Sequence, residues 1–122
     1  MNATLLLDVH VAWAWVVVFA NALVGLWALG AHWIAPLRVR GLWWAVVAAE
    51  VAIATQVALG GAIFAGQGID APEFHMFYGF IALVAVAIIY SYRNQLRASL
   101  YLLYGFGSLF LMGLAIRAML LG

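Results

Sequence analysis

The sequence predicts an all-α integral membrane protein, built as a four-transmembrane-helix up-down bundle. Hydrophobic residues make up 70% of the 122 positions and charged residues only 7%, which is far from the composition of a soluble domain. Four apolar segments are each close to the roughly 20 residues that cross about 30 Å of hydrocarbon. The breaks between them are short, so neighbouring helices are expected to run antiparallel. No soluble domain fits in the remainder, and residues 1–122 form a single membrane domain.

The four helices are expected at approximately 8–31, 41–65, 72–92 and 97–121. The first begins near Asp8, where a cleaved signal peptide would carry positive charge, so we expect this helix to stay in the mature protein.

The start of the third helix has its own sequence signal. Asp70 and Glu73 are spaced as in a capping box, and Pro72 is tolerated in a first helical turn because no amide is needed there.

The arginines predict the orientation. Arg38, Arg40, Arg93 and Arg97 fall in the first and third breaks, and positive residues in short loops stay on the cytoplasmic side. Both termini are therefore expected to be extracytoplasmic, and a bacterial inner (cytoplasmic) membrane is the expected location. Aromatic side chains are expected to gather at the inner interface (Trp33, Trp43, Trp44, Tyr90, Tyr92, Tyr101, Tyr104) and at the outer one (Trp13, Trp15, Phe74, Tyr78).

Several function classes are excluded by residue content. The chain has no cysteine, so disulfides, thiolate metal sites and covalent c-type haem attachment are ruled out. Its five arginines are scattered, which argues against a nucleic-acid partner. No phosphate loop or hydrolase triad is present, and no catalytic residue is assigned. Redox chemistry and scaffolding remain.

Two histidines carry the main functional hypothesis. His10 and His75 lie near the outer ends of the first and third helices, which run in the same direction and are diagonal in an up-down bundle. Counting about 1.5 Å per residue places them at similar depth, where two imidazoles provide both axial ligands of one b-type haem iron. The alternative is that each is an ordinary hydrogen-bonded interfacial side chain. His32, beside Trp33, is interpreted as interfacial.

Other polar or small residues are candidates at the same site. Gln56 is expected close to a haem edge or to a backbone carbonyl, and Gly79 leaves a slot beneath His75. Arg117 lies near the outer end of the fourth helix, where it either pairs with one of the acidic residues Asp8, Asp70 and Glu73 or reaches haem propionates.

Glu50 lies within the second span, where an ionised carboxylate is costly. Asn21 is at similar depth on the first helix, so a hydrogen bond between them is expected. A proton-relay or quinone-contact role for Glu50 is the alternative.

The run Gln56 to Gly61 (QVALGG), followed after a loop by His75, resembles one four-helix half of haem A synthase. The segment from Asp8 to Leu29 is similar to that family's second helix, and helices one to three cover most of the resemblance. The resemblance implies that His10 and His75 match ligand histidines of haem b. The chain departs from the family, since it has the length of one half. Leu7 and Val11 stand where that family has a glutamate and an arginine, so only the fold and a haem pocket are implied.

The first hypothesis is therefore a small b-type cytochrome that transfers electrons as a subunit of a larger respiratory or photosynthetic complex. Its partners would be the lipid bilayer and other membrane subunits of a redox complex. The alternatives are a cofactor-free accessory subunit and a haem-handling assembly factor. A carotenoid, chlorophyll or lipid in the same slot is a further alternative.

Overall fold

A computed structural model describes residues 3–66, 68 and 72–122, and this part of the chain is helical without strands. The long helices are α1 (Ala3–Trp33), α2 (Arg40–Gly61), α3 (Glu73–Ser91) and α4 (Leu100–Leu120). Shorter turns are η1 (Ala35–Leu37), the π-helical η2 (Ala62–Gly66) and η3 (Arg97–Ser99). Four helices are long and apolar enough to cross a membrane, which confirms the predicted all-α, four-span class.

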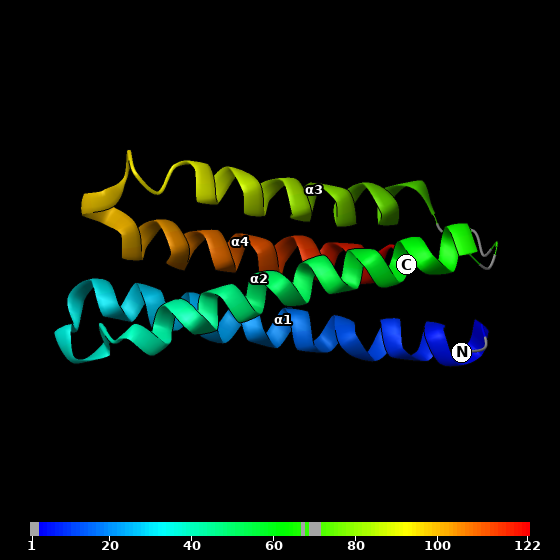
Figure 1. The fold of residues 1–122 in the computed structure, drawn as a ribbon, viewed down its shortest axis with the longest axis horizontal. Helices are drawn as coiled ribbons and strands as arrows, with labels where there is room; N and C mark the ends of the chain where they lie inside the picture. The colour runs from blue at the N-terminus through cyan, green and yellow to red at the C-terminus, as the bar shows by residue number, and fades with distance from the viewer. Residues whose placement is uncertain (1–2, 67, 69–71) are drawn as a thin grey trace.

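The helices run up, down, up and down, so the connections alternate between two ends of the bundle (Figure 1). One end is formed by η1 and η3 together with Arg38, Arg40 and Arg93, and we call it the arginine end. At the other end lie the start of α1, the end of α4 and the turn η2 that follows α2 (Figure 1); we call it the histidine end, after His10 and His75. The assignment of each end to a side of the membrane stays a prediction.

The four helices pack as a square with one loose edge. α1 packs closely against α4 and α2, and α3 packs against α4, whereas α2 and α3 make few contacts. α1 and α3 are therefore diagonal, and the bundle is open along the α2–α3 edge.

Close packing is concentrated where α1 crosses α4. A Cβ atom added at Gly105 would lie 2.6 Å from Cγ of Leu29 and 2.9 Å from its backbone nitrogen, and one at Gly25 would lie 2.8 Å from Cγ of Leu109. Missing side chains let the two backbones approach one another. Nearby, Ala28 and Leu42 are completely buried, so this part of the core is closed to the surroundings.

The turn between α1 and α2 is tied down by side chains. Arg38 donates from Nε to the carbonyl of Ala31 and from Nη2 to that of His32, both at 2.6 Å. The last carbonyls of a helix have no partner within the helix, and a nearby cation satisfies them. Trp27 adds a bond of 3.0 Å from Nε1 to the carbonyl of Leu37.

The aromatic residues follow the predicted belts only in part. Trp33 and Trp44 are each 70% exposed, as expected of interfacial residues. Tyr104, however, is 7% exposed, and Trp43 packs against it with ring centroids 5.5 Å apart. Trp13 turns inward and donates from Nε1 to the carbonyl of Ala52 at 2.9 Å. Tyr104 is therefore packed between α4 and α2, unlike the exposed Trp33 and Trp44, and its depth at the inner interface stays a prediction.

The helix boundaries differ from the expected ones at three places, one of which is the start of α4 at Leu100 after the turn η3. α1 begins at Ala3 rather than near Asp8, and α2 ends in a π turn from Ala62. α3 begins at Glu73 with Pro72 as its N-cap residue, and no side-chain hydrogen bond caps it within the described chain. The predicted capping role of Asp70 lies outside the described residues.

Candidate functional site

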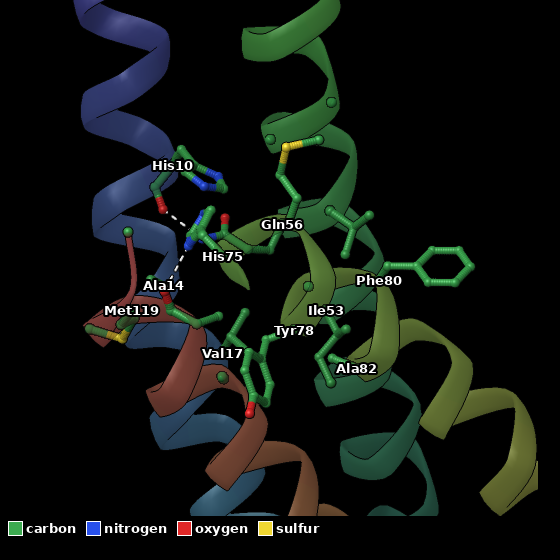
Figure 2. Close-up of a pocket in the computed structure, with 18 of the residues that line it drawn as sticks. His10, Ala14, Val17, Ile53, Gln56, His75, Tyr78, Phe80, Ala82 and Met119 are labelled. Carbon is green, nitrogen blue, oxygen red and sulfur yellow. Dashed lines mark hydrogen bonds between the residues drawn. The ribbon is translucent and has the colours of Figure 1, made fainter. Parts of the chain in front are cut away.

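The imidazoles of His10 and His75 approach one another at the histidine end. Their ring centroids are 6.0 Å apart and the ring planes are inclined by 82°. Figure 2 shows the two side chains converging from α1 and from α3, the diagonal pair of helices. The depth match estimated by counting residues is therefore realised as a direct juxtaposition of the rings.

His75 is held by the backbone of α4. Its Nδ1 lies 2.7 Å from the carbonyl oxygen of Ala118 (Figure 2). Because a carbonyl only accepts, Nδ1 carries the hydrogen of this contact, and in the neutral tautomer Nε2 has the lone pair. Gly122 packs on the same ring, since a Cβ atom there would lie 2.7 Å from Nδ1. This is the arrangement that fixes the tautomer and the direction of a metal-binding histidine.

His10 is held by contacts with α2. Gln56 donates from Nε2 to the backbone carbonyl of His10 at 2.7 Å (Figure 2), so the prediction that Gln56 reaches a backbone carbonyl matches the structure. The ring packs on Gly60, where an added Cβ atom would lie 3.2 Å from Cε1 of His10. Both Nδ1 of His10 and Oε1 of Gln56 are buried without a hydrogen-bond partner in the described chain. Such atoms are uncommon in proteins and indicate a missing partner.

A cavity of about 460 Å³ lies beside the two histidines. Its size is within the range of about 300–1,000 Å³ typical of small-molecule and cofactor sites. All four helices contribute to the lining, which is apolar apart from His10, Gln56, His75 and Tyr78. The cavity continues to the loose α2–α3 edge, where Phe80 lies (Figure 2).

Glycines keep this cavity open. Gly61 and Gly79 both line it, and a Cβ atom added at either would meet no other atom within 4 Å. The predicted slot at Gly79 is therefore present. These glycines face empty space, whereas Gly105 is in close contact with α1.

Arg117 has a different environment from the one expected. No ion pair joins it to Asp8 or Glu73 among the described residues, so those two pairings are wrong; Asp70 lies outside the described chain. The side chain is exposed, and its Cζ lies 5.9 Å from the ring centroid of Tyr78, which lines the cavity. Arg117 is thus a cation near the cavity without a carboxylate partner in the described chain.

The predicted hydrogen bond between Asn21 and Glu50 is not formed. Asn21 is completely buried, and its Nδ2 donates to the carbonyl of Val17 in its own helix at 2.9 Å. The Asn21 side chain instead folds back onto the preceding turn of its own helix. Glu50 is left without a hydrogen bond to any described residue.

His32 lies apart from the site. It is near the last turn of α1 at the arginine end, with its ring centroid 4.7 Å from that of Trp33. Within the described residues, no group of three or more histidine, cysteine, aspartate or glutamate side chains is arranged to hold a metal ion. Any metal at the histidine pair would have two protein ligands.

Comparison with known proteins does not add to this geometry. Neither a scan against protein-family models nor searches of curated proteins and of solved structures gave a match to this chain. Sequence reasoning missed two parts of the site, the Ala118 carbonyl and the Gly60 surface under His10. A backbone carbonyl has no signal in the sequence, and Gly60 looks the same as the open Gly61 beside it.

Proposed function

We propose that this chain is a small b-type haem-binding membrane protein for electron transfer, with His10 and His75 as the two axial ligands. The supporting observation is the 6.0 Å separation of the ring centroids. Bonds from a metal to imidazole nitrogen are about 2 Å long, so two imidazoles on opposite sides of one iron have centres about 6 Å apart. No large side-chain movement is needed to reach that spacing.

The surrounding residues fit a flat apolar group at this position. The imidazoles meet between α1 and α3, and residues of α2 and α4 that line the cavity would flank a bound group. Gly60 and Gly61 are on the α2 side, and Ala115 and Ala118 are on the α4 side. Small residues on both sides leave room for a macrocycle, and Arg117 is the nearby cation suited to its carboxylates.

Each group has a definite task in this proposal. The bound haem supplies reversible one-electron chemistry. The Ala118 carbonyl directs Nε2 of His75, and Gln56 fixes the backbone that carries His10. The apolar lining excludes water, which strengthens electrostatic interactions inside the site.

A role as one subunit of a larger complex is supported by α3. Only 17% of its apolar span is buried against the rest of the protein. Phe77 and Phe80 are both more than half exposed. Much of this helix is therefore available to lipid or to a neighbouring subunit. The same observation favours the second candidate function, a cofactor-free accessory subunit.

The test is a reduced-minus-oxidised absorption spectrum of the detergent-purified protein, with a pyridine haemochrome assay to identify and count the haem. We expect a low-spin b-type signal near one haem per chain. His10→Ala and His75→Ala should each abolish it, because one axial ligand is lost, whereas His32→Ala should leave it unchanged. A spectrum indifferent to His75→Ala would end the proposal. Absence of haem from folded wild-type protein would favour the accessory subunit.

A further inference from the structure

A second hollow lies on the outer surface of the bundle, apart from the histidines. It is a groove of about 440 Å³ between α3 and α4, which pack side by side (Figure 1), and we call it the α3–α4 groove. None of its lining residues lines the histidine cavity. Most of the lining comes from α4 and from the link that contains η3 (Leu96, Ser99, Leu102, Leu103, Phe106, Phe110).

One face of α4, together with its N-cap residue Ser99, gives the groove its length. Ser99, Leu103, Phe106 and Phe110 recur at intervals of three or four residues, which places them on one side of the helix. Phe106 is 60% exposed and Phe110 58%, so no other described element covers this face. From Ser99 to Phe110 the chain rises about 16 Å. This is about half of the roughly 30 Å of hydrocarbon in a bilayer, or the depth of one leaflet.

The lining of the groove is apolar except at one end. Ile89 of α3 packs against Gly107 of α4, since a Cβ atom added at Gly107 would lie 2.8 Å from Cδ1 of Ile89. Leucine and phenylalanine side chains make up most of the rest. Ser99 brings the polar side chain of the lining, and its hydroxyl makes no capping hydrogen bond with α4. Polarity in the groove is therefore confined to the arginine end.

Two arginines lie at this polar end. Arg97 is in η3, between the lining residues Leu96 and Ser99, and its side chain is exposed. In the described chain its guanidinium makes one long hydrogen bond, 3.5 Å from Nη2 to Oδ1 of Asn94. Arg93, earlier in the same link, donates to a backbone carbonyl. Neither arginine forms an ion pair with a described residue.

The sequence has no acidic residue near these arginines. Its four acidic residues are Asp8, Glu50, Asp70 and Glu73, and positions 74–122 contain none. Glu50 is near the middle of α2, and Asp8 and Glu73 are at the histidine end. The counter-charge at the arginine end therefore has to come from the surroundings of the protein.

We propose that the α3–α4 groove binds one anionic phospholipid, with its phosphate at Arg97 and Ser99 and an acyl chain along α4 as far as Phe110. A phosphate accepts hydrogen bonds from both a guanidinium and a hydroxyl. The apolar face has the length of one leaflet, which matches a single acyl chain. Anionic lipids give the cytoplasmic leaflet its negative surface potential, and the arginine end is the predicted cytoplasmic end. The inference is independent of the proposed haem site.

The experiment is native mass spectrometry of the full chain in detergent, titrated with phosphatidylglycerol or with phosphatidylcholine of the same acyl chains. We expect one phosphatidylglycerol per chain, bound more tightly than phosphatidylcholine. Arg97→Gln should weaken phosphatidylglycerol binding about fivefold, the factor for loss of one basic residue near an anionic lipid. Arg97→Lys should retain most of the binding, because the positive charge remains.

Arg40→Gln is the matched control for the charge. It removes one positive charge at the same end, from an exposed position on α2, which contributes no residue to the groove. Its binding of phosphatidylglycerol should equal that of wild type. Circular dichroism checks that each variant keeps its helices.

The apolar part of the groove has its own pair of variants. Phe106→Ala should weaken binding of both lipids severalfold, because apolar surface is lost from the groove. Phe19→Ala is the control, since Phe19 is 59% exposed on α1 and lies outside the groove. It should change the binding of neither lipid.

Four results would overturn the proposal. The first is equal binding of the two lipids to the wild-type protein, and the second is an equal loss of phosphatidylglycerol in Arg97→Gln and Arg40→Gln. The third is displacement of phosphatidylglycerol by inorganic phosphate, which would make the site one for free phosphate. The fourth is a dimer without bound lipid, which would show that a second copy of the chain covers the groove.

Discussion

The two ends of the bundle are built in opposite ways. Towards the arginine end, α1 and α4 touch through Gly105 and Leu29, and Arg38 bonds to the last carbonyls of α1. At the histidine end, α2 and α3 separate, glycines face empty space, and buried polar atoms such as Nδ1 of His10 lack partners. Close α1–α4 contacts are therefore found towards one end. Of the three buried side-chain atoms without a partner in the described chain, those of His10 and Gln56 are at the other end, and Oδ1 of Asn21 lies near the middle of α1.

The largest expected effect tests the compact half. Gly105→Ala should destabilise the protein by about 3 kcal/mol, the upper end for overpacking, because the backbone of Leu29 would have to move. The measurement is unfolding in mixed detergent micelles, followed by circular dichroism. Gly113→Ala is the matched control in the same helix, since its Cβ atom meets nothing within 4 Å. It should stabilise the helix by up to about 1 kcal/mol. Equal changes in stability in Gly105→Ala and Gly113→Ala would contradict the proposed difference in packing at these two positions.

The next effect tests the open half. Gly79→Leu should lower haem affinity by about tenfold or more, because the new side chain fills the cavity. Stability without haem should not fall, since apolar surface is gained in free space. Haem titration and unfolding of the same preparation measure both quantities. Gly113→Leu, on an exposed position of α4, should leave haem affinity unchanged. Loss of stability in Gly79→Leu would mean that the cavity is closed in the membrane.

A smaller effect is expected at the α1–α2 turn. Arg38→Gln should cost about 1 kcal/mol, because two carbonyl oxygens lose a charged donor while remaining close to water. Arg40→Gln is the control, since this exposed arginine makes no hydrogen bond to a described residue. Chemical unfolding of both variants gives the comparison. A larger loss for Arg40→Gln would show that net charge at this end matters more than the bonds.

The smallest effect is expected at Trp13. Trp13→Phe removes the bond to the Ala52 carbonyl and keeps most of the ring contacts, so the cost should be about 0.5–1.5 kcal/mol. Because this bond joins α1 to α2 through two residues that do not line the cavity, the haem spectrum should not change. Unfolding and absorption spectra of the same Trp13→Phe preparation measure the loss of stability and the haem signal. A shift of the haem spectrum would show that Trp13 belongs to the site.

The sequence was sufficient for the helices and for the pairing of His10 with His75. Hydropathy defines spans because lipid requires apolar length, and a fixed rise per residue gives depth. Rotation about each helix axis is not available from depth. Side-chain direction is not available from depth either, so Asn21 and Glu50, which were predicted at the same level, do not bond, and Tyr104, which was predicted at the interface, packs inside the bundle. The opening between α2 and α3 depends on how all four helices pack.

The Arg38 bonds also bear on the order in which the protein is made. They join residues six and seven positions apart. Both bonds can therefore form within the α1–α2 hairpin before α3 leaves the ribosome. His10 and His75 are separated by 65 positions in the chain, and the imidazole pair exists only after the third span has been inserted. Binding of the proposed haem would therefore be a late step of biogenesis, on a hairpin that is already held together at its arginine end.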